Sequence, residues 1–357
     1  MPPHRVTLRD IAAETGFHFT TVGLALRSSS QLPKETIEKV RAAAERMGYR
    51  PSPLLSALSS FRNHPQKTLT GIIGFLCTYD FRLAARTDVR AYRMFKAAET
   101  FAEAKGFKLE PIQIDLTNPN PSHVAAVLKA RGIQAVILPP LMPRAGPFMA
   151  LPWENFSVVG VGYSITNLRP HRVCFSHFQG MLLHLRKLRE RGYERIGLTM
   201  NSEVNVRTGG NLLGALLAEQ RGHDRRSWIE PCLVSSAQSD RRRIIQWIRR
   251  EKPDCVLLDG METFELIKAE GFRVPEDFGV ALTSRDDETS PIAGIDEQDE
   301  HLGEAAVDFV ISLLRTDERG LPQYPRYAMV EARWVYRPTV RSIASDEVLL
   351  EKTKISA

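Results

Sequence analysis

Apolar residues near the N-terminus recur at helical spacing, and the first such segment is VTLRDIAAETG. Leu8 and Ile11 share one face of the predicted helix. Thr7 can accept from the first-turn amides, and Asp10 stands three residues on, where a capping box has its acid. Gly16 follows at a place that favours positive φ. The pattern predicts a short helix that begins after Thr7 and ends before Gly16.

Two further segments near the N-terminus have the same spacing. FTTVGLALR puts Val22 and Ala25 on an inner face, and KETIEKVRAAAERMGY repeats apolar residues from Ile37 to Met47. Two short helices joined by a glycine-containing turn make a helix-turn-helix pattern. Each helix is too short to stand alone, so we expect a three-helix, all-α headpiece over residues 1–50. Spacing alone leaves open an arbitrary small helical bundle with a charged surface.

From Thr70 the pattern changes to apolar strands that alternate with amphipathic helices. GIIGFLCT, KLEPIQID and QAVILPP read as strands, and a second series begins near Cys174 with strands such as RIGLTM, CVLLDG and GVALTS. This is the rhythm of a parallel sheet covered by helices on both faces. Two series predict two doubly wound α/β lobes in residues 67–357.

Charge is distributed unevenly along the 357 residues, whose formal net charge is +6. Residues 1–62 hold nine Lys/Arg against five Asp/Glu, whereas the rest holds 39 against 37. A basic head on a neutral body predicts a polyanionic partner for the head alone. The N-terminus does not resemble a signal peptide and no apolar run reaches 18 residues, so we expect a soluble, cytoplasmic protein without membrane contact.

Motifs of enzymes and metal sites are missing from the sequence. The four cysteines are far apart and form no CxxC pair, so neither a zinc site nor a disulfide framework is indicated, and we expect no metal and no cofactor. GxSxG, a Walker loop and HExxH do not occur. Catalysis is not expected.

The head resembles a known family. The stretch VTLRDIAAETG...TTV...LALR...TIEKVRAAAERMGYRPSP, some 45 residues, is similar to the lactose-repressor/galactose-repressor (LacI/GalR) family of bacterial regulators. The resemblance implies that residues 19–27 form a recognition helix in the major groove of a palindromic operator. It also implies that Phe19, Thr20 and Leu24 meet base edges.

The recognition helix departs from the family pattern. His18 replaces the usual serine cap, and Gly23-Leu24 replaces a Ser-Arg pair, so a bidentate guanine contact is lost there. We expect Thr20 and Thr21 to contact bases or phosphates, and Leu24 to reach only a thymine methyl. For His18, a phosphate contact and no role at all both stay open. Cationic side chains expected to contact phosphates rather than bases are Arg5, Arg9, Arg27 and Lys34.

A hinge segment and linker are expected over residues 51–66. Ser52 and Pro53 predict the start of a helix of only about two turns, which is too short to be stable in water without further contacts. The resemblance implies that two copies of it meet over DNA and that Leu58 wedges between minor-groove base pairs. The alternative is that Leu54, Leu55 and Leu58 only pack the head onto the body. The expected DNA-binding residues are Thr7, His18, Phe19, Thr20, Thr21, Leu24, Arg27, Leu55 and Leu58.

The body resembles the periplasmic-binding-protein-like core of the same regulators. The resemblance implies a ligand in the cleft at the carboxyl ends of the strands, and we expect lobe crossings near 171–174, 298–301 and 320–327. The expected effector-binding residues are Tyr79, Asp80, Tyr163, Arg207, Asp259, Asp287 and Glu297. An arginine at the place of Arg207 binds effector in many relatives. A surface ion pair for Arg207, solvated loop carboxylates and core tyrosines are the alternatives.

Taken together, these features predict a homodimeric, sequence-specific DNA-binding transcription regulator, expected to be a repressor. Its operator affinity would depend on a small effector, a sugar or sugar derivative. A regulator that responds to a protein partner or acts without effector stays open. A solute-binding protein would need a signal peptide, and an enzyme would need a clustered nucleophile and base, neither of which is visible in the sequence.

Overall fold

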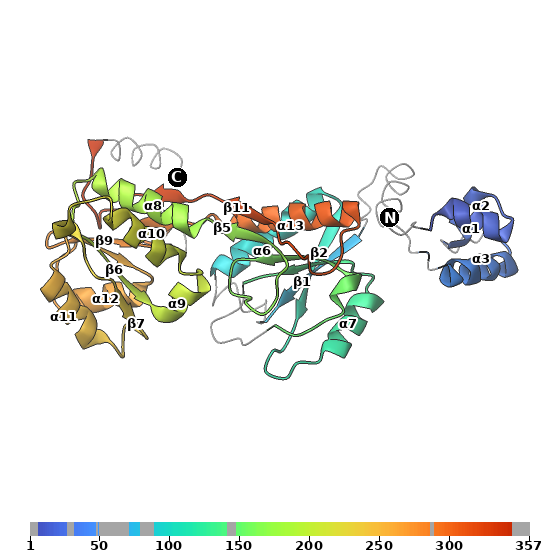
Figure 1. Cartoon of the computed structure of the whole chain (residues 1–357), viewed down its shortest axis with the longest axis horizontal. Helices are drawn as coiled ribbons and strands as arrows, with labels where there is room; N and C mark the ends of the chain where they lie inside the picture. The colour runs from blue at the N-terminus through green and yellow to red at the C-terminus, as the bar shows by residue number, and fades with distance from the viewer. Residues whose placement is uncertain are drawn as a thin grey trace. The chain divides into compact units, whose positions relative to one another are not determined.

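The computed structural model describes residues 6–26, 32–47, 49, 71–78, 89–140, 148–285 and 289–344. The chain divides into two compact units, Met1–Thr70 and Gly71–Ala357, which are described separately (Figure 1). The predicted hinge and linker, residues 51–66, lie outside the described residues.

Among the described residues of the first unit are three helices, α1 (Leu8–Thr15), α2 (Phe19–Leu26) and α3 (Lys34–Arg46). Ile11, Val22 and Val40, one from each helix, are fully buried against one another. The predicted capping box is present at the start of α1, and Gly16 ends that helix with φ +72°. Because a residue with a side chain rarely adopts this backbone conformation, glycine is what allows the tight turn into α2.

The second unit contains two six-stranded sheets, one per lobe. The first sheet is wholly parallel, in the order β11-β5-β4-β3-β1-β2. Its strands are β1 (Gly71–Cys77), β2 (Phe107–Gln113), β3 (Ala135–Leu138), β4 (Ser157–Val161), β5 (His171–Phe175) and β11 (Tyr327–Val330). Its helices are α6 (Val89–Ala104), α7 (Pro121–Ala130) and α13 (Asp299–Thr316).

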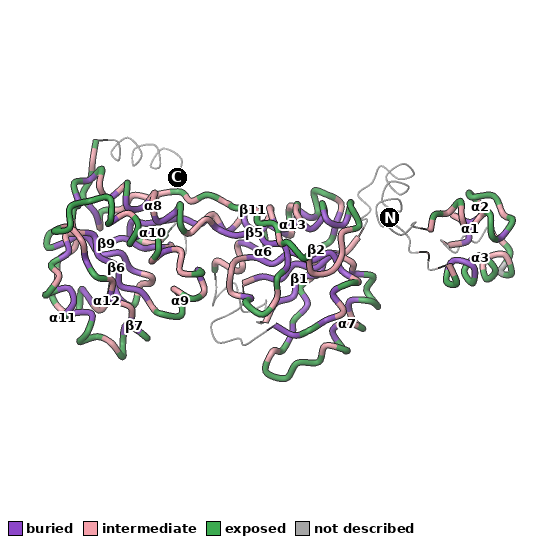
Figure 2. Tube along the Cα trace, viewed as in Figure 1, coloured by how far each residue is buried: buried purple, intermediate pink, exposed green. Residues whose placement is uncertain are grey.

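Helices cover both faces of the first sheet because its buried strands present apolar side chains alternately to each side. Ile73 and Phe75 of β1 pack with α6 and α13, whereas Leu76 packs on the opposite face with α7. The four central strands, β1, β3, β4 and β5, are consequently buried along most of their length (Figure 2).

The second sheet has the order β12-β10-β9-β8-β6-β7, and only β12 is antiparallel to its neighbour. Its strands are β6 (Ile196–Asn201), β7 (Cys232–Val234), β8 (Cys255–Leu258), β9 (Gly279–Leu282), β10 (Ala293–Asp296) and β12 (Arg333–Val335). Its helices are α8 (His177–Arg189), α9 (Ser202–Arg207), α10 (Asn211–Gln220), α11 (Arg241–Glu251) and α12 (Met261–Ala269). Helices α8 and α10 cover one face, and α11 and α12 the other.

The chain passes between the lobes after β5, after β10 and after β11. The crossings were expected near 171–174 and 320–327, and in the structure they follow Phe175 and Val330, a few residues later. Residues 171–175 form β5, which pairs with β4, and residues 327–330 form β11, which pairs with β5, so both segments still belong to the first sheet. The middle crossing is at residues 297–298, between β10 and α13.

The four cysteines are buried and none forms a disulfide. Among the helices of the described residues, none is both long and apolar enough to cross a membrane.

Candidate functional site

The first turn of α2 presents side chains outward from the head. Phe19 is 45% exposed, which is unusual for a large apolar side chain, and Thr20 beside it is exposed as well. Leu24, one turn further along, is half-buried. Because Val22 and Ala25 hold the opposite side of the helix in the core, this turn is free to meet a partner.

Three polar residues of the predicted DNA-binding set, Thr7, His18 and Thr20, already make contacts within the head. His18 Nδ1 lies 2.8 Å from Thr20 Oγ1, and the His18 ring lies against Phe19 at 4.4 Å between centroids. The Thr7 hydroxyl donates to Asp10 Oδ2 at 2.8 Å and belongs to the capping box. Thr7 thus has a structural role irrespective of DNA.

Three residues of the predicted DNA-binding set, Arg27, Leu55 and Leu58, lie outside the described residues. Thr21 is half-buried on α2.

The body encloses a cavity of about 470 Å³ between its two lobes. This volume suits a small molecule. The first lobe contributes residues at the carboxyl ends of β4 and β5, among them Tyr163, Phe175 and His177. The second lobe contributes residues that follow β6, β8 and β9, among them Arg207 and Asp259. The cavity therefore lies where parallel α/β sheets generally bind ligands.

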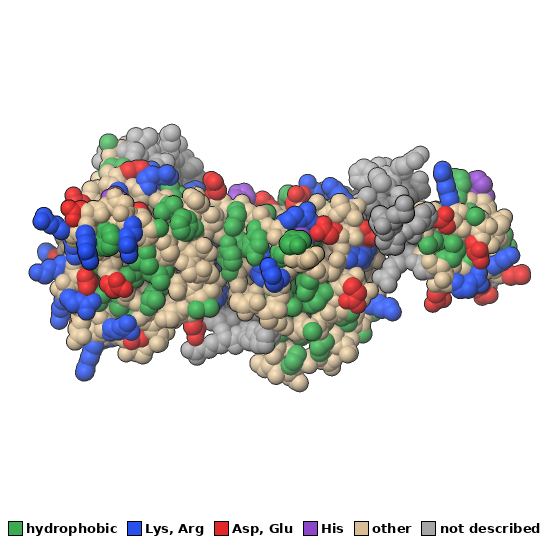
Figure 3. Space-filling view, in the orientation of Figure 1, with side chains coloured by type: hydrophobic (Ala, Val, Ile, Leu, Met, Phe, Trp, Pro, Cys, Tyr) green, Lys and Arg blue, Asp and Glu red, His purple; other side chains and the backbone are tan. Residues whose placement is uncertain are grey.

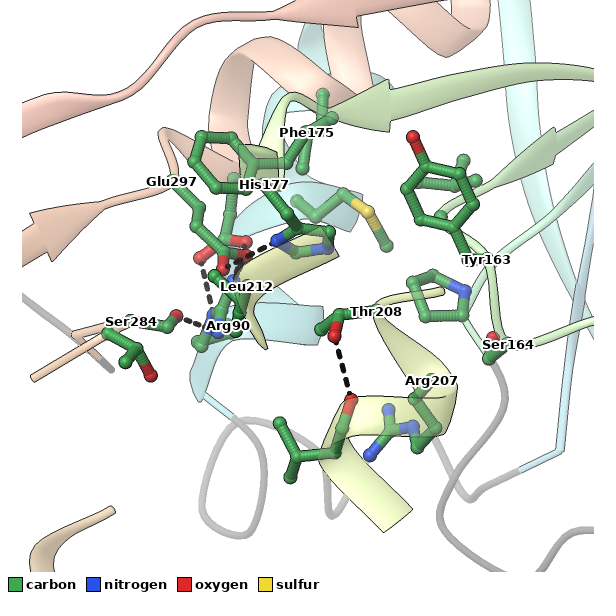
Figure 4. Close-up of a pocket in the computed structure, with 18 of the residues that line it drawn as sticks. Arg90, Tyr163, Ser164, Phe175, His177, Arg207, Thr208, Leu212, Ser284 and Glu297 are labelled. Atoms are coloured by element: carbon green, nitrogen blue, oxygen red, sulfur yellow. Dashed lines mark hydrogen bonds and ion pairs between the residues drawn. The ribbon is translucent and has the colours of Figure 1, made fainter. Parts of the chain in front are cut away.

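A cluster of charged residues forms one wall of the cavity (Figure 4). Arg90, at the start of α6, donates to both oxygens of Asp299 at 2.9 and 3.0 Å and also to Glu297. The same guanidinium donates to Ser284 Oγ, which follows β9 in the other lobe. Arg90 therefore joins the first lobe, the middle crossing and the second lobe. His177 Nδ1 lies 3.6 Å from the second carboxylate oxygen of Glu297.

Burial and pairing set the charges of this cluster. Burial raises the pKa of Glu297, but the charge of Arg90 and its hydrogen bond to Glu297 outweigh this effect, so the pKa of Glu297 is lowered and the group is ionised at neutral pH. Burial raises the pKa of Asp299, and Arg90 only partly offsets the shift. Burial, helped by the charge of Arg90, lowers the pKa of His177 and keeps its ring neutral.

Four of the predicted effector-binding residues, Tyr163, Arg207, Asp259 and Glu297, line this one cavity. Glu297 is 8% exposed, so the alternative of a solvated loop carboxylate was wrong for this residue. The other three predicted residues, Tyr79, Asp80 and Asp287, lie outside the described residues.

Asp259 and Tyr163 also make contacts within the protein. Asp259 Oδ2 accepts from the backbone N–H of Asn201 at 2.6 Å, which ties the end of β8 to the end of β6, and burial raises its pKa. The Tyr163 ring stacks near Tyr327 at 6.4 Å and lies 5.8 Å from His177.

Sequence reasoning missed Arg90, Phe175, His177, Ser284 and Asp299 in the cavity wall. Ser284 could have been selected, because it is a polar residue at the end of the predicted strand GVALTS. His177 could have been selected for the same reason if β5 had been recognised as a strand. No comparable signal marks Arg90, because its acidic partners lie about 200 positions away along the chain.

The head alone matches a known family model, whereas structural similarity extends into the body. Residues 7–52 match the model of the family described as bacterial regulatory proteins, lacI family. No curated protein sequence matches the chain.

Solved structures are similar over nearly the whole chain. One is a transcriptional regulator CelR–cellobiose complex, at 17% identity and TM-score 0.55, covering 94% of this chain and 100% of that one. Another is the lac repressor dimer bound to operator and the anti-inducer ONPF, at 20% identity and TM-score 0.55, covering 95% and 100%. A LacI transcriptional regulator from Rhodococcus species has 14% identity and TM-score 0.57, covering 75% and 98%. At such identities the likeness establishes the fold, a helical head followed by two parallel α/β lobes.

Proposed function

Because this chain is a LacI-family transcription regulator, we propose that a small effector controls its affinity for an operator. Proteins of this family bind DNA and are regulators rather than enzymes. The effector binds between the lobes of the body. Its binding shifts the balance between two arrangements of the protein, as differential affinity requires. A regulator of this kind works in the cytoplasm, where the DNA is.

The single observation that carries this proposal is the interlobe cavity of about 470 Å³. Its wall combines apolar surfaces from Met94, Phe175 and Leu212 with the polar groups of Arg207 and Asp259. A small ligand needs both kinds of surface, the first for burial and the second for orientation.

We favour a sugar or sugar derivative as the effector. Carboxylates and arginines accept and donate the hydrogen bonds that hydroxyl groups need, and the Tyr163 ring offers a face on which a sugar ring can stack. One structurally similar regulator, CelR, forms a complex with cellobiose, which supports the same class. Control by a protein partner, or no effector at all, is the second candidate.

Thermal melting of the full chain against a panel of mono- and oligosaccharides, sugar phosphates and nucleobases tests the proposal. A ligand at 100 times its Kd stabilises the folded state by about 2.7 kcal/mol. We expect a sugar to raise Tm in the wild type but not in Arg207→Met. The matched control is Arg273→Met, an exposed residue outside the cavity wall, which should keep the full shift. No shift with any panel member would favour the second candidate.

For the DNA side, we propose that Phe19, Thr20, Thr21 and Leu24 read the operator as part of a homodimer. Phosphate contacts come from His18 and Arg27, while Leu55 and Leu58 of the hinge enter the minor groove. Dimerisation follows because one head buries too little surface for tight specific binding, whereas a two-fold protein reads a palindrome. Sedimentation that shows only monomer would contradict the dimer.

Leu58→Ala tests the hinge proposal. The variant should lose much more affinity for the cognate palindrome, once this is selected from random sequence, than for a random duplex. Ser59→Ala is the neighbouring control and should bind both DNAs as the wild type does. Equal losses of Leu58→Ala on the two DNAs would remove the wedge.

A further inference from the structure

The net charge of the body is near zero, but one segment of the second lobe is strongly basic. Residues 221–252 hold nine Lys/Arg against four Asp/Glu, whereas the rest of the chain after residue 62 holds 30 against 33. All 32 residues of this segment are described. Figure 3 shows Lys and Arg side chains gathered over the end of the second lobe that α11 helps to form.

The core of this basic segment is the solvent face of α11. Ile244, Ile245, Trp247 and Ile248 are buried under the helix, so positions 242, 243, 246, 249 and 250 lie together on its exposed side. Four of these five are arginines and the fifth is Gln246. We call these four side chains, Arg242, Arg243, Arg249 and Arg250, the arginine stripe.

Nearby structure extends the arginine stripe. The Arg195 guanidinium donates to the carbonyls of Glu251 at 2.5 Å and Lys252 at 3.3 Å, and also to that of Arg226. It thereby joins the C-terminal end of α11 to the short helix Arg225–Ser227, whose two arginines are exposed. The basic surface is thus built from two segments that this bridge holds together.

Acidic side chains neutralise only part of the surface. Glu270 accepts from Arg241 at 2.6 Å and lies 4.0 Å from Arg249, and Glu251 accepts from Arg250 at 2.8 Å. Arg249 and Arg250 nevertheless stay 65% and 70% exposed. Within the part of the chain that the structure describes, no acidic side chain lies within ion-pair distance of Arg225, Arg226 or Arg242.

The chemistry of this surface favours a nucleic acid backbone over a protein partner. Protein interfaces have a buried core of aromatic and apolar anchors, depleted in charge. Of the large apolar side chains exposed in the described residues, none lies between 221 and 252. Arginine forks match phosphate oxygens, and the stripe from 242 to 250 spans about 12 Å, the axial rise of about three phosphates along one DNA strand.

We propose that the arginine stripe is a second DNA-binding surface, which holds the phosphate backbone of a duplex without reading its sequence. This duplex is distinct from the one bound by the head. The body can therefore hold a second DNA segment while the head occupies its operator. The proposal is independent of the effector and of the contacts made by the recognition helix.

The test is a bridging assay with the full chain. Protein is bound to an immobilised random duplex at about 50 mM salt, and the capture of a second, labelled random duplex is measured. The variant carries Arg242→Gln, Arg243→Gln and Arg250→Gln. The matched control carries Lys129→Gln, Arg186→Gln and Arg315→Gln, three exposed cations elsewhere on the body that remove the same charge.

We expect the wild type and the control to capture the second duplex, and the stripe variant to lose at least tenfold in its capture. Three phosphate contacts give a salt slope of about −2.7, so wild-type capture should fall about 40-fold between 50 and 200 mM salt. Capture by the stripe variant equal to that of the control, or no capture by the wild type, overturns the proposal. Binding to the first duplex reports on the head, so its failure in all three proteins would concern the proposed function instead.

Discussion

His184 lies on α8 in the interior of the second lobe, and its surroundings predict how the stability of the protein depends on pH. Its side chain is fully buried, and neither ring nitrogen has a hydrogen-bond partner among the described residues. The ring packs against Trp334 at 4.9 Å, and the Arg191 guanidinium lies over the rings of Trp334 and Tyr336. Burial in these surroundings lowers the pKa of His184 to about 3.

The size of the effect follows from the two pKa values. In the unfolded chain the pKa of a histidine is about 6.5, so the unfolded state takes up a proton near pH 6.5 that the folded state refuses until about pH 3. Stability is therefore unaffected above pH 6.5 and falls as the pH drops through that window. Between pH 7 and pH 5 the loss from this one group is about 2 kcal/mol.

Substitution of His184 by leucine, which has a similar volume, should remove this loss. Because the two unpaired ring nitrogens also disappear, we expect His184→Leu to melt at or above the wild-type Tm at pH 7. At pH 5 the gap should widen by about 4–8 °C. Calorimetry of both proteins at the two pH values measures it, with the exposed His123→Leu as control. If the wild type and His184→Leu lose the same Tm between pH 7 and pH 5, the reasoning is refuted.

Further predictions concern the buried charge cluster, a helix contact and a cap, each measured by urea unfolding of the full chain. Arg90→Met removes the arginine partner of the buried Glu297 and Asp299 and should lower the free energy of unfolding by about 3–5 kcal/mol at pH 7. The loss should be smaller at pH 5, because the carboxylates then take up protons. Arg273→Met, at an exposed ion pair, should change the free energy of unfolding little, and equal losses in the two variants would contradict the buried pairing. Gly303→Ala should cost about 1–3 kcal/mol, because its new Cβ would lie 2.2 Å from a backbone oxygen of α6. Gly214→Ala, with no atom within 4 Å, should instead stabilise by about 0.5–1 kcal/mol, and stabilisation by both would refute the close approach. Thr7→Ala should lower head stability by about 1 kcal/mol through loss of the capping box, and no change would mean that the cap is dispensable.

The sequence was sufficient where structure depends on local pattern. The capping box at Thr7 and the turn at Gly16 were predictable because each is fixed by residues within one helical turn. The same holds for strands such as β1 and β8, whose apolar runs are bounded by turn residues.

Features that depend on distant parts of the chain were not predictable. HRVCF is too short to distinguish a sheet strand from a crossing, and only its pairing with β4 and β11 makes it one. In the cavity, Tyr163, Arg207 and Asp259 could be selected because each stands near the end of a strand. Arg90 could not, since its role depends on how the helices α6 and α13 pack.

The crossing after β10, which returns the chain to the first lobe, has a consequence for the synthesis of the protein. The first sheet lacks its edge strand, and its core lacks α13, until residues 299–330 have left the ribosome. The last of these residues follows β5 by about 155 positions, which at 5–20 residues per second is a delay of about 8–31 s. During this interval the nascent first lobe exposes the apolar faces of Met94 and Phe95 on α6. The nascent chain should therefore be a substrate for chaperones until its last strand, β12, has joined the second sheet.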